Sequence, residues 1–182
     1  MGGTKQQVEE GRIDMPDLVL SAGASAPPAR IYATLADLST HTTWAGSMHG
    51  KKNFGLRTLE ASSDPAVVGT EFRSTGDDPM GSFTDRSVVT EATDPSVFEF
   101  VTEGHLEPRK PGRPACDTRI TYRFETAPAD TGSTVTYRLH ISKWTNAPRV
   151  LRSVVLRPIA RMATRIYAKK MLRNLAAYAA TN

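Results

Sequence analysis

Apolar and polar residues alternate regularly in two neighbouring stretches, Thr118–Thr126 and Thr134–Ser142. Successive side chains of a β-strand point to opposite faces, so this alternation predicts two strands that each have one apolar and one polar face. Asp130-Thr131-Gly132 lies between them and is typical of a hairpin turn. The apolar faces of the two predicted strands consist of Ile120, Tyr122, Phe124, Val135, Tyr137, Leu139 and Ile141.

Five further stretches have the residue pattern and the flanking turn residues of strands. They are Asp17–Ser25, Lys52–Glu60, Val68–Ser74, Phe83–Ala92 and Val97–Thr102. Short turns between most of the strands are typical of an antiparallel meander. The long interruption at residues 103–117 is rich in Pro, Gly and basic residues. Two interpretations of it stay open, a mobile loop or the tip of an extended hairpin.

Two short helices are predicted after the first strand. The prolines of Ser25-Ala26-Pro27-Pro28 favour a helix start, and Ala29–Leu38 follows with its apolar residues on one side. A second short turn then leads to Trp44 and ends at Gly46.

The longest helical pattern is Ala147–Thr181, with Asn146 predicted as its N-cap. An interior proline removes a backbone donor and costs about 3 kcal/mol, so Pro158 predicts a kink or break near Leu156. Basic residues recur every four positions and form a ridge that drifts slowly around the helix: Arg157, Arg161, Arg165, Lys169 and Arg173. The apolar residues are expected near one side of the helix, and they are Leu151, Val155, Ile159, Met162, Ile166, Met171, Leu175 and Tyr178.

This order of elements predicts an α+β fold. A sheet of about seven antiparallel strands with one apolar face is covered most simply when it curls around the single long C-terminal helix. Residues 1–12 are polar and are predicted to be a disordered tail, and residues 13–182 are predicted to form one domain.

Composition narrows the class of protein. Hydrophobic residues make up 39% and charged residues 23% of the chain, as in ordinary globular proteins, and no apolar run is long enough for a membrane span. The polar N-terminus lacks the hydrophobic region of a secretory signal, and a single Cys116 excludes an internal disulfide. A cytoplasmic location is therefore expected.

The net charge of +4 is unevenly distributed, because no acidic residue follows Asp130. Such a basic C-terminal helix is usually a solvated outer face, and the alternative is a docking surface for an anionic membrane or an acidic partner. The sequence has no RNA-binding sheet motif and no zinc-finger spacing, so no nucleic-acid partner is predicted.

Several stretches, in this order of elements, resemble the superfamily of START-related lipid-transfer proteins, pollen allergens and polyketide cyclase/dehydrase-like proteins. The stretches are Ala26–Tyr32 with Leu35-Ala36-Asp37 and Trp44, Val68–Arg73, Thr118–Phe124 and Gly132–Tyr137. The resemblance covers most of residues 17–181 and implies the helix-grip fold, with a deep apolar cavity between the sheet and the C-terminal helix. It also implies a hydrophobic small-molecule ligand such as a lipid, isoprenoid or polyketide, and it supplies no shared catalytic motif.

Under this interpretation the apolar strand faces and the helix line the cavity, although the same residues would also serve a closed core. Tyr122 and Tyr137 are the best candidates to orient a ligand, because a buried phenol needs a partner that a ligand oxygen can supply. Trp44 is a candidate gate at the cavity mouth, and a core role is the alternative. The predicted lining residues are Trp44, Phe72, Phe98, Phe100, Ile120, Tyr122, Phe124, Tyr137, Leu139, Met162, Ile166 and Tyr167.

An aromatase or cyclase of the polyketide type is the alternative function. It requires a polar group inside the cavity to stabilise an enolate, and Arg86 and Tyr122 are the candidates, while the alternation directs Arg73 outward. Of the four histidines, His41 lies nearest the expected entrance and is expected to be solvent-exposed. No His or Cys pair has metal-ligand spacing, and no phosphate-binding or dinucleotide motif is present, so neither a metal nor a cofactor is predicted.

Overall fold

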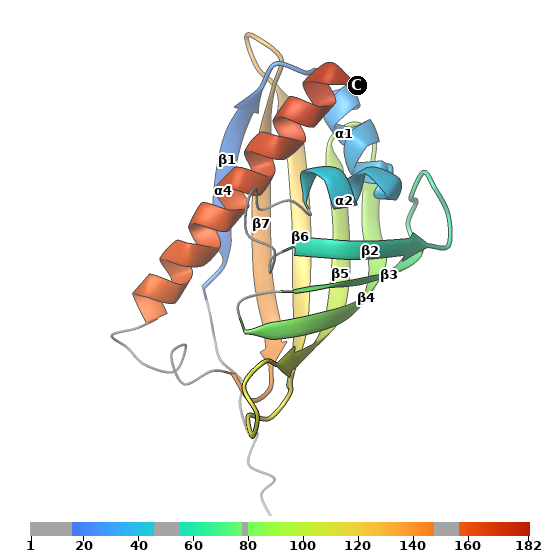
Figure 1. The fold of residues 1–182 in the computed structure, drawn as a ribbon. Coiled ribbons are helices and arrows are strands. Elements are labelled where there is room, and N and C mark those ends of the chain that lie inside the picture. The colour runs from blue at the N-terminus through green and yellow to red at the C-terminus, as the bar shows by residue number, and fades with distance from the viewer. Residues whose placement is uncertain (1–15, 46–54, 78–79, 148–156) are drawn as a thin grey trace, which may run out of the picture.

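The computed structural model describes residues 16–45, 55–77, 80–147 and 157–182. Its elements are β1 (Leu18–Ala24), α1 (Pro28–Ala36), η1 (Leu38–Thr40), α2 (His41–Trp44), β2 (Gly55–Ala61), β3 (Glu71–Asp77), β4 (Gly81–Thr93), β5 (Val97–Pro108), β6 (Cys116–Pro128), β7 (Ser133–Trp144) and α4 (Arg157–Thr181). Seven strands form one antiparallel sheet in the order β1-β7-β6-β5-β4-β3-β2. Figure 1 shows this sheet curving, with α1, α2 and α4 on one side of it. The fold is therefore the predicted α+β helix grip.

Residues 103–117 form the tip of an extended hairpin, which is the second of the two interpretations. β5 continues to Pro108 and β6 already begins at Cys116, so most of the segment belongs to strands. Cross-strand pairs hold the extension together on its outer face, for example Arg119 with Glu103 at 2.8 Å. Pro111, Gly112 and Pro114 lie in the turn between the two strands, whereas Gly104 and Pro108 belong to β5.

The third strand begins later than predicted. Val67 to Thr70 form a turn in which the Thr70 amide donates to the Val67 carbonyl at 2.9 Å, and Gly69 has a φ of +89°. The strand therefore starts at Glu71, and Val68 lies in the turn with 60% of its surface exposed.

The core lies between the concave face of the sheet and the helices. Ile31 and Leu35 of α1 are completely buried, and so is Phe98 on β5. Helix α1 begins with Pro28 in its first turn, where a missing N–H costs nothing. α4 crosses the same face and packs against β1, α1 and α2. No helix in the described part of the chain is long and apolar enough to cross a membrane.

Asn146 is not the N-cap of the C-terminal helix, which corrects the prediction. Its side-chain amide donates to the Ala115 carbonyl at 2.9 Å, and its φ of +49° ends the strand path after β7. The described helix starts at Arg157, which places Pro158 in a first turn that tolerates proline. Several predicted features lie outside the described residues: the tail at residues 1–12, the end of the short helix at Gly46, the start of the second strand at residues 52–54, and the kink near Leu156 together with Leu151 and Val155.

Candidate functional site

Aromatic side chains from β5, β6 and β7 meet on the concave face because the strand register aligns them. Two adjacent cross-strand rows result. The first consists of Phe98, Phe124 and Tyr137, and the second of Phe100, Tyr122 and Leu139. The rings of Phe100 and Tyr122 stack at 5.0 Å between centroids, and those of Phe124 and Tyr137 lie 5.1 Å apart.

Phe72 extends this aromatic wall onto β3, with its ring centroid 5.3 Å from that of Phe100. The strand residues predicted to line a cavity therefore do share one face of the sheet. They differ in burial: Phe72, Phe98, Phe124 and Tyr137 are at most 4% exposed, whereas Phe100, Tyr122 and Leu139 are only partly buried.

Polar side chains continue the same concave face beyond the aromatic rows, and they were not among the residues predicted from the sequence. The hydroxyls of Ser87 and Thr102 lie 2.8 Å apart, and both residues are at most 3% exposed. In the next row Gly104 is flanked by Asp85 and Thr118. A Cβ on Gly104 would lie 2.7 Å from both Asp85 Oδ1 and Thr118 Oγ1, so these two oxygens occupy the space above the glycine.

A signal for this polar end is present in the sequence. Phe98, Phe100 and Thr102 are spaced by two residues and therefore share a face, and Asp85 and Ser87 share the face of Val89. These polar residues are overlooked when every inward-facing position is expected to be apolar, and the predicted face then ends at the aromatic rows.

The hydroxyls of Tyr122 and Tyr137 have no hydrogen-bond partner among the described residues. Among the described residues, only Trp144 Nε1 is a polar side-chain atom that is both fully buried and without a partner. The two tyrosine oxygens lack a partner but are not in this class, so each keeps some accessible surface. Tyr167 on α4 differs, since its hydroxyl donates to the Ala45 carbonyl at 3.1 Å. The two sheet tyrosines thus keep open hydrogen-bonding capacity on the inner side of the fold.

Burial raises the pKa of the Tyr122 phenol above its ordinary value, and the nearby Asp85 and Tyr167 act in the same direction. Burial likewise raises the pKa of Tyr137, with smaller contributions from Tyr122 and Tyr167. Both phenols are therefore protonated at neutral pH, which makes them hydrogen-bond donors as well as acceptors.

The inner face of α4 is defined by Ala168, Leu172, Leu175 and Ala179, which are at most 3% exposed and are spaced by three or four residues. Continuing this spacing toward the start of the helix leads to Thr164 and Arg161, and Arg161 indeed donates to the Asp17 carbonyl beside β1, at 3.4 Å. Thr164 and Arg161 therefore continue the inner side of α4, although both residues are exposed in this part of the helix.

Met162 and Ile166 point away from the sheet, contrary to the prediction that they lie on the apolar side with Met171 and Leu175. They are 64% and 63% exposed. A step of five residues, from Ile166 to Met171, turns an α-helix by about 140° beyond a full revolution and so changes the face. The inner positions in this part of the helix belong to other residues.

Trp44 and His41 are core residues of α2. Trp44 is 3% exposed, donates from its indole nitrogen to Thr40 Oγ1 at 3.0 Å, and meets the Phe124 ring edge-on. His41 is 4% exposed rather than solvent-exposed as expected, and burial lowers its pKa to about 4. A neutral, fully packed imidazole is poorly placed for acid–base work at an entrance.

Arg86 lies on the outer face of the sheet, so it is not the inward polar group of the cyclase hypothesis. Its guanidinium donates to both carboxylate oxygens of Glu71, at 2.9 and 3.1 Å, and more than half of its side chain is exposed. Arg73 is its cross-strand neighbour and is also exposed, as the alternation predicted. Of the two catalytic candidates, only Tyr122 is on the concave face.

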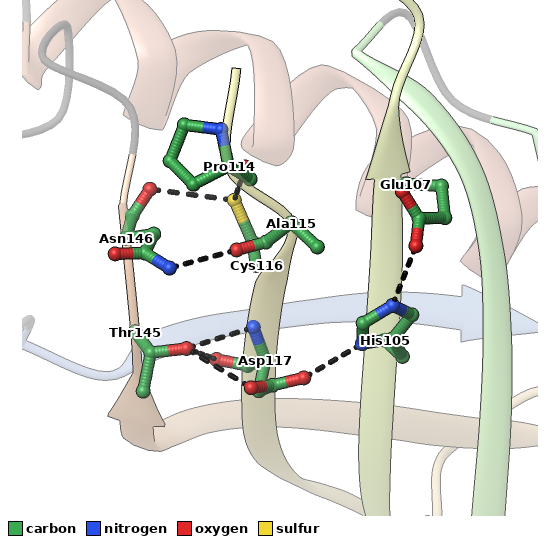
Figure 2. Close-up of polar contacts among 8 residues, drawn as sticks. All are labelled: His105, Glu107, Pro114, Ala115, Cys116, Asp117, Thr145 and Asn146. Atoms are coloured by element: carbon green, nitrogen blue, oxygen red, sulfur yellow. Dashed lines mark hydrogen bonds and ion pairs between the residues drawn. The ribbon is translucent and has the colours of Figure 1, made fainter. Parts of the chain in front are cut away.

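A second polar cluster lies at the far end of the long hairpin (Figure 2). His105 Nδ1 is 2.7 Å from Asp117 Oδ1, and His105 Nε2 is 3.0 Å from Glu107 Oε1. These hydrogen bonds, with Asp117 first, raise the pKa of His105. The two carboxylates bind opposite nitrogens of one ring, so they cannot share a metal ion with it. Among the described residues no group of three His, Cys, Asp or Glu side chains could hold a metal.

Cys116 also lies in this region but points elsewhere (Figure 2). Its thiol is buried and lies 3.3 Å from the Asn146 carbonyl oxygen. Thr145 binds the backbone amide of Asp117 at 2.9 Å, which joins the end of β7 to the start of β6. These contacts therefore connect the end of β7 to the start of β6. The Cys116 thiol does not lie beside His105 as a nucleophile would.

Residues 25–180 match the profile of the family described as "Activator of Hsp90 ATPase homolog 1-like protein". The chain belongs to this family. The match spans α1 through α4 and agrees with the helix-grip superfamily that the sequence resembles. A search among curated proteins found no match.

Solved structures of similar fold are numerous. A putative uncharacterized protein from Rhizobium leguminosarum has a TM-score of 0.64 at 11% identity, covering 92% of this chain and 95% of that one. Protein CV1439 from Chromobacterium violaceum has a TM-score of 0.59 at 14% identity, covering 91% and 98%. Ara h 8.0201 has a TM-score of 0.56 at 12% identity, covering 92% of this chain and 99% of that one. At these identities the likeness establishes the fold of this chain, and not its ligand.

Proposed function

We propose that this protein binds a hydrophobic small molecule that carries at least one oxygen, in the space between the concave sheet face and the inner face of α4. The observation that carries the proposal is the pair of tyrosine hydroxyls, Tyr122 and Tyr137, which have no hydrogen-bond partner among the described residues. Proteins with this fold commonly bind hydrophobic ligands, which supports the general class.

The unpartnered hydroxyls favour a ligand oxygen over a plain hydrocarbon. A ligand without an oxygen would cover these hydroxyls and remove them from water without a partner, which costs about 1–3 kcal/mol for each group. A carbonyl or hydroxyl of a ligand would accept from, or donate to, these phenols. The stacked rings of Phe100 and Tyr122 would meanwhile contact a flat apolar body.

Small residues on the inner side of α4 are compatible with such a ligand. Ala168 is 2% exposed, and Thr164 lies one turn earlier on the same side of the helix, where it is exposed. The larger Met162 and Ile166 point outward. Partial exposure of Phe100, Tyr122 and Leu139 on the opposite wall is consistent with a space there.

Binding is better supported than catalysis. The raised pKa values of Tyr122 and Tyr137 keep both phenols protonated, which suits them to orient a ligand and makes them poor bases. The cyclase hypothesis loses Arg86, which is paired with Glu71 on the outer face. The family name refers to activation of the Hsp90 ATPase, and no described feature of this chain favours that activity over ligand binding.

A pair of matched probes tests the proposal. 1-Acetylnaphthalene carries a ketone, and 1-ethylnaphthalene has nearly the same shape without it. We expect both to bind in one-to-one, saturable titrations, and the Tyr122→Phe and Tyr137→Phe variants to weaken the ketone by about fivefold relative to the hydrocarbon. Tyr178→Phe is the control, because Tyr178 lies near the C-terminal end of α4. It should leave the ratio of ketone affinity to hydrocarbon affinity unchanged.

Two outcomes would overturn the proposal. One is the absence of saturable binding of either probe to a protein whose circular dichroism and cooperative melt are those of the folded state. The other is a ketone preference that both phenylalanine variants retain in full. If the probe titrations support the proposal, native mass spectrometry after incubation with a lipid extract would identify the natural ligand.

A further inference from the structure

The outward face of α4 carries an exposed apolar pair, Met162 and Ile166, separated by one helical turn. They are 64% and 63% exposed, the highest values among the large hydrophobic residues of the described chain. On the helix they lie opposite the buried positions Ala168 and Leu175. This pair therefore contributes nothing to the core.

Basic residues surround the pair on the same face. Lys169 and Lys170 lie three and four residues after Ile166, and Arg173 lies seven residues after it, so all three project near Ile166. Arg165 lies three residues after Met162 and is exposed. No acidic residue compensates these charges within the helix, since the sequence has none after Asp130.

The basic residues of α4 lie on two different sides of the helix. Arg161 faces β1 and binds the Asp17 carbonyl, so it belongs to the inner side. Because a four-residue repeat advances by about 40° per step, the later members Lys169 and Arg173 have rotated to the outer side with Met162 and Ile166. In Figure 1 the first turns of α4, at lower left, extend past β1.

We propose that this outer face of α4 docks on a bilayer surface that contains anionic lipid. Apolar side chains of an interfacial helix enter the boundary between headgroups and acyl chains, while the flexible stems of Lys and Arg carry their charges to the lipid phosphates. Each basic residue near such a surface adds about 1 kcal/mol of attraction. The surface would act as a peripheral contact and is independent of what the sheet binds.

Charge distinguishes this occupant from a second copy of the chain. Two such faces would bring Lys169, Lys170 and Arg173 of each copy together, and like charges at close range repel. An anionic bilayer satisfies the apolar pair and the cations at once. An acidic protein satisfies the cations, but it requires its own groove for Met162 and Ile166.

Vesicle flotation of the whole 182-residue chain tests the proposal. We expect binding to phosphatidylcholine vesicles containing about one third phosphatidylglycerol, and weaker binding when salt is raised from about 0.05 M to about 0.5 M. Met162→Ser combined with Ile166→Ser should lower binding at least tenfold. Lys169→Gln combined with Arg173→Gln should lower it at low salt and flatten its salt dependence.

The chain supplies matched controls for both changes. Val67 and Val68 are an exposed apolar pair in the turn before β3, at 58% and 60%, and Arg73 is an exposed cation on the sheet. Val67→Ser with Val68→Ser, and Arg73→Gln, should bind as the wild type does. Circular dichroism and naphthalene-probe binding should be unchanged in every variant, which separates this proposal from the ligand site.

Three results would overturn the proposal. They are no flotation of the wild type, equal flotation with pure phosphatidylcholine vesicles, and wild-type flotation of the Met162/Ile166 double variant. Binding to polyglutamate in place of vesicles would assign the surface to an acidic protein and would equally refute a membrane contact.

Discussion

His41 Nε2 donates a hydrogen bond to the backbone carbonyl of Leu35 across 2.8 Å, inside the core. The bond fixes the neutral tautomer with the proton on Nε2, and the ring packs at 4.5 Å against Trp44. Helices α1 and α2 are thereby joined by a titratable group that is 4% exposed.

The stability of the fold should fall in mild acid because of His41. Burial lowers its pKa from 6.5 to about 4, against the opposing effects of the Leu35 bond and Asp37. The unfolded chain therefore binds a proton first, so this contribution is complete above pH 6.5 and is lost as the pH falls toward 4. The loss amounts to about 1.4 kcal/mol per pH unit, or roughly 3 kcal/mol in total. Urea unfolding from pH 7 down to pH 4 measures it.

His41→Gln supplies the comparison, because glutamine can still donate to the Leu35 carbonyl and does not titrate. We expect its stability to depend less on pH between 6.5 and 4 than that of the wild type. His140→Gln is the control, since His140 is an exposed residue that pairs with Asp17. Equal pH slopes for the wild type and His41→Gln would contradict the prediction.

The three inner tyrosines should respond differently to loss of the hydroxyl. Tyr167→Phe removes the bond to the Ala45 carbonyl and should cost about 1 kcal/mol, because the carbonyl loses its donor. Tyr122→Phe and Tyr137→Phe remove no hydrogen bond to a described residue, so they should be neutral or slightly stabilising without ligand. Thermal melts of the ligand-free proteins provide the test. A loss of 1 kcal/mol or more in both sheet variants would show that protein groups satisfy these phenols.

The strands were predictable because apolar and polar residues alternate in the sequence wherever one face of the strand is apolar. Phe98 and Phe100, like Tyr122 and Phe124, were assigned to the correct face for this reason. Arg86 could not be placed, because Val88 and Val89 follow each other and the register shifts between Val89 and Glu91. Such a bulge interrupts the period on which the assignment depends.

The helix and the polar end of the concave face were harder to predict. Met162 and Ile166 were placed inward by their apolar character, although the step to Met171 reverses the face. Asp85 and Thr118 were missed because inward-facing positions were assumed to be apolar, although alternation places Asp85 on the face of Val89. Whether a tyrosine hydroxyl finds a partner depends on contacts between distant strands and helices, which no local pattern records.

Gly132 should be far less tolerant of substitution than Gly69, although both have a φ of +89°. A Cβ on Gly132 would lie 2.1 Å from the Ala24 carbonyl oxygen, whereas a Cβ on Gly69 would meet open space. Gly69→Ala should therefore cost only the strain of the left-handed conformation, about 1 kcal/mol. Gly132→Ala should cost about 3 kcal/mol or more, because β1 must also move. The difference between the urea midpoints of the two variants measures the cost of the clash at Gly132. Equal midpoints would show that no such clash occurs.

Arg123 should stabilise the outer face more than any isolated surface ion pair, because three carboxylates converge on it. Its guanidinium binds Glu99 at 3.0 Å, Glu125 at 2.9 Å and also Glu91, and only 26% of its side chain is exposed. Arg123→Gln would leave these carboxylates facing one another across three strands. We expect a loss of about 1–2 kcal/mol at low salt, and a smaller loss at high salt because salt screens the repulsion.

Arg119 provides the matched control for Arg123, since it pairs with the single carboxylate of Glu103 at 2.8 Å and both side chains are more than half exposed. Arg119→Gln should cost less than about 0.5 kcal/mol. The hydrogen bond from Arg123 also lowers the pKa of Glu125, so this contribution is present at neutral pH and is lost as the pH falls through the folded-state pKa. The stability difference between wild type and Arg123→Gln should therefore shrink in acid, and the Glu125 titration followed by NMR should move upward in the variant. An unchanged Glu125 titration would show that Arg123 does not hold that carboxylate in solution.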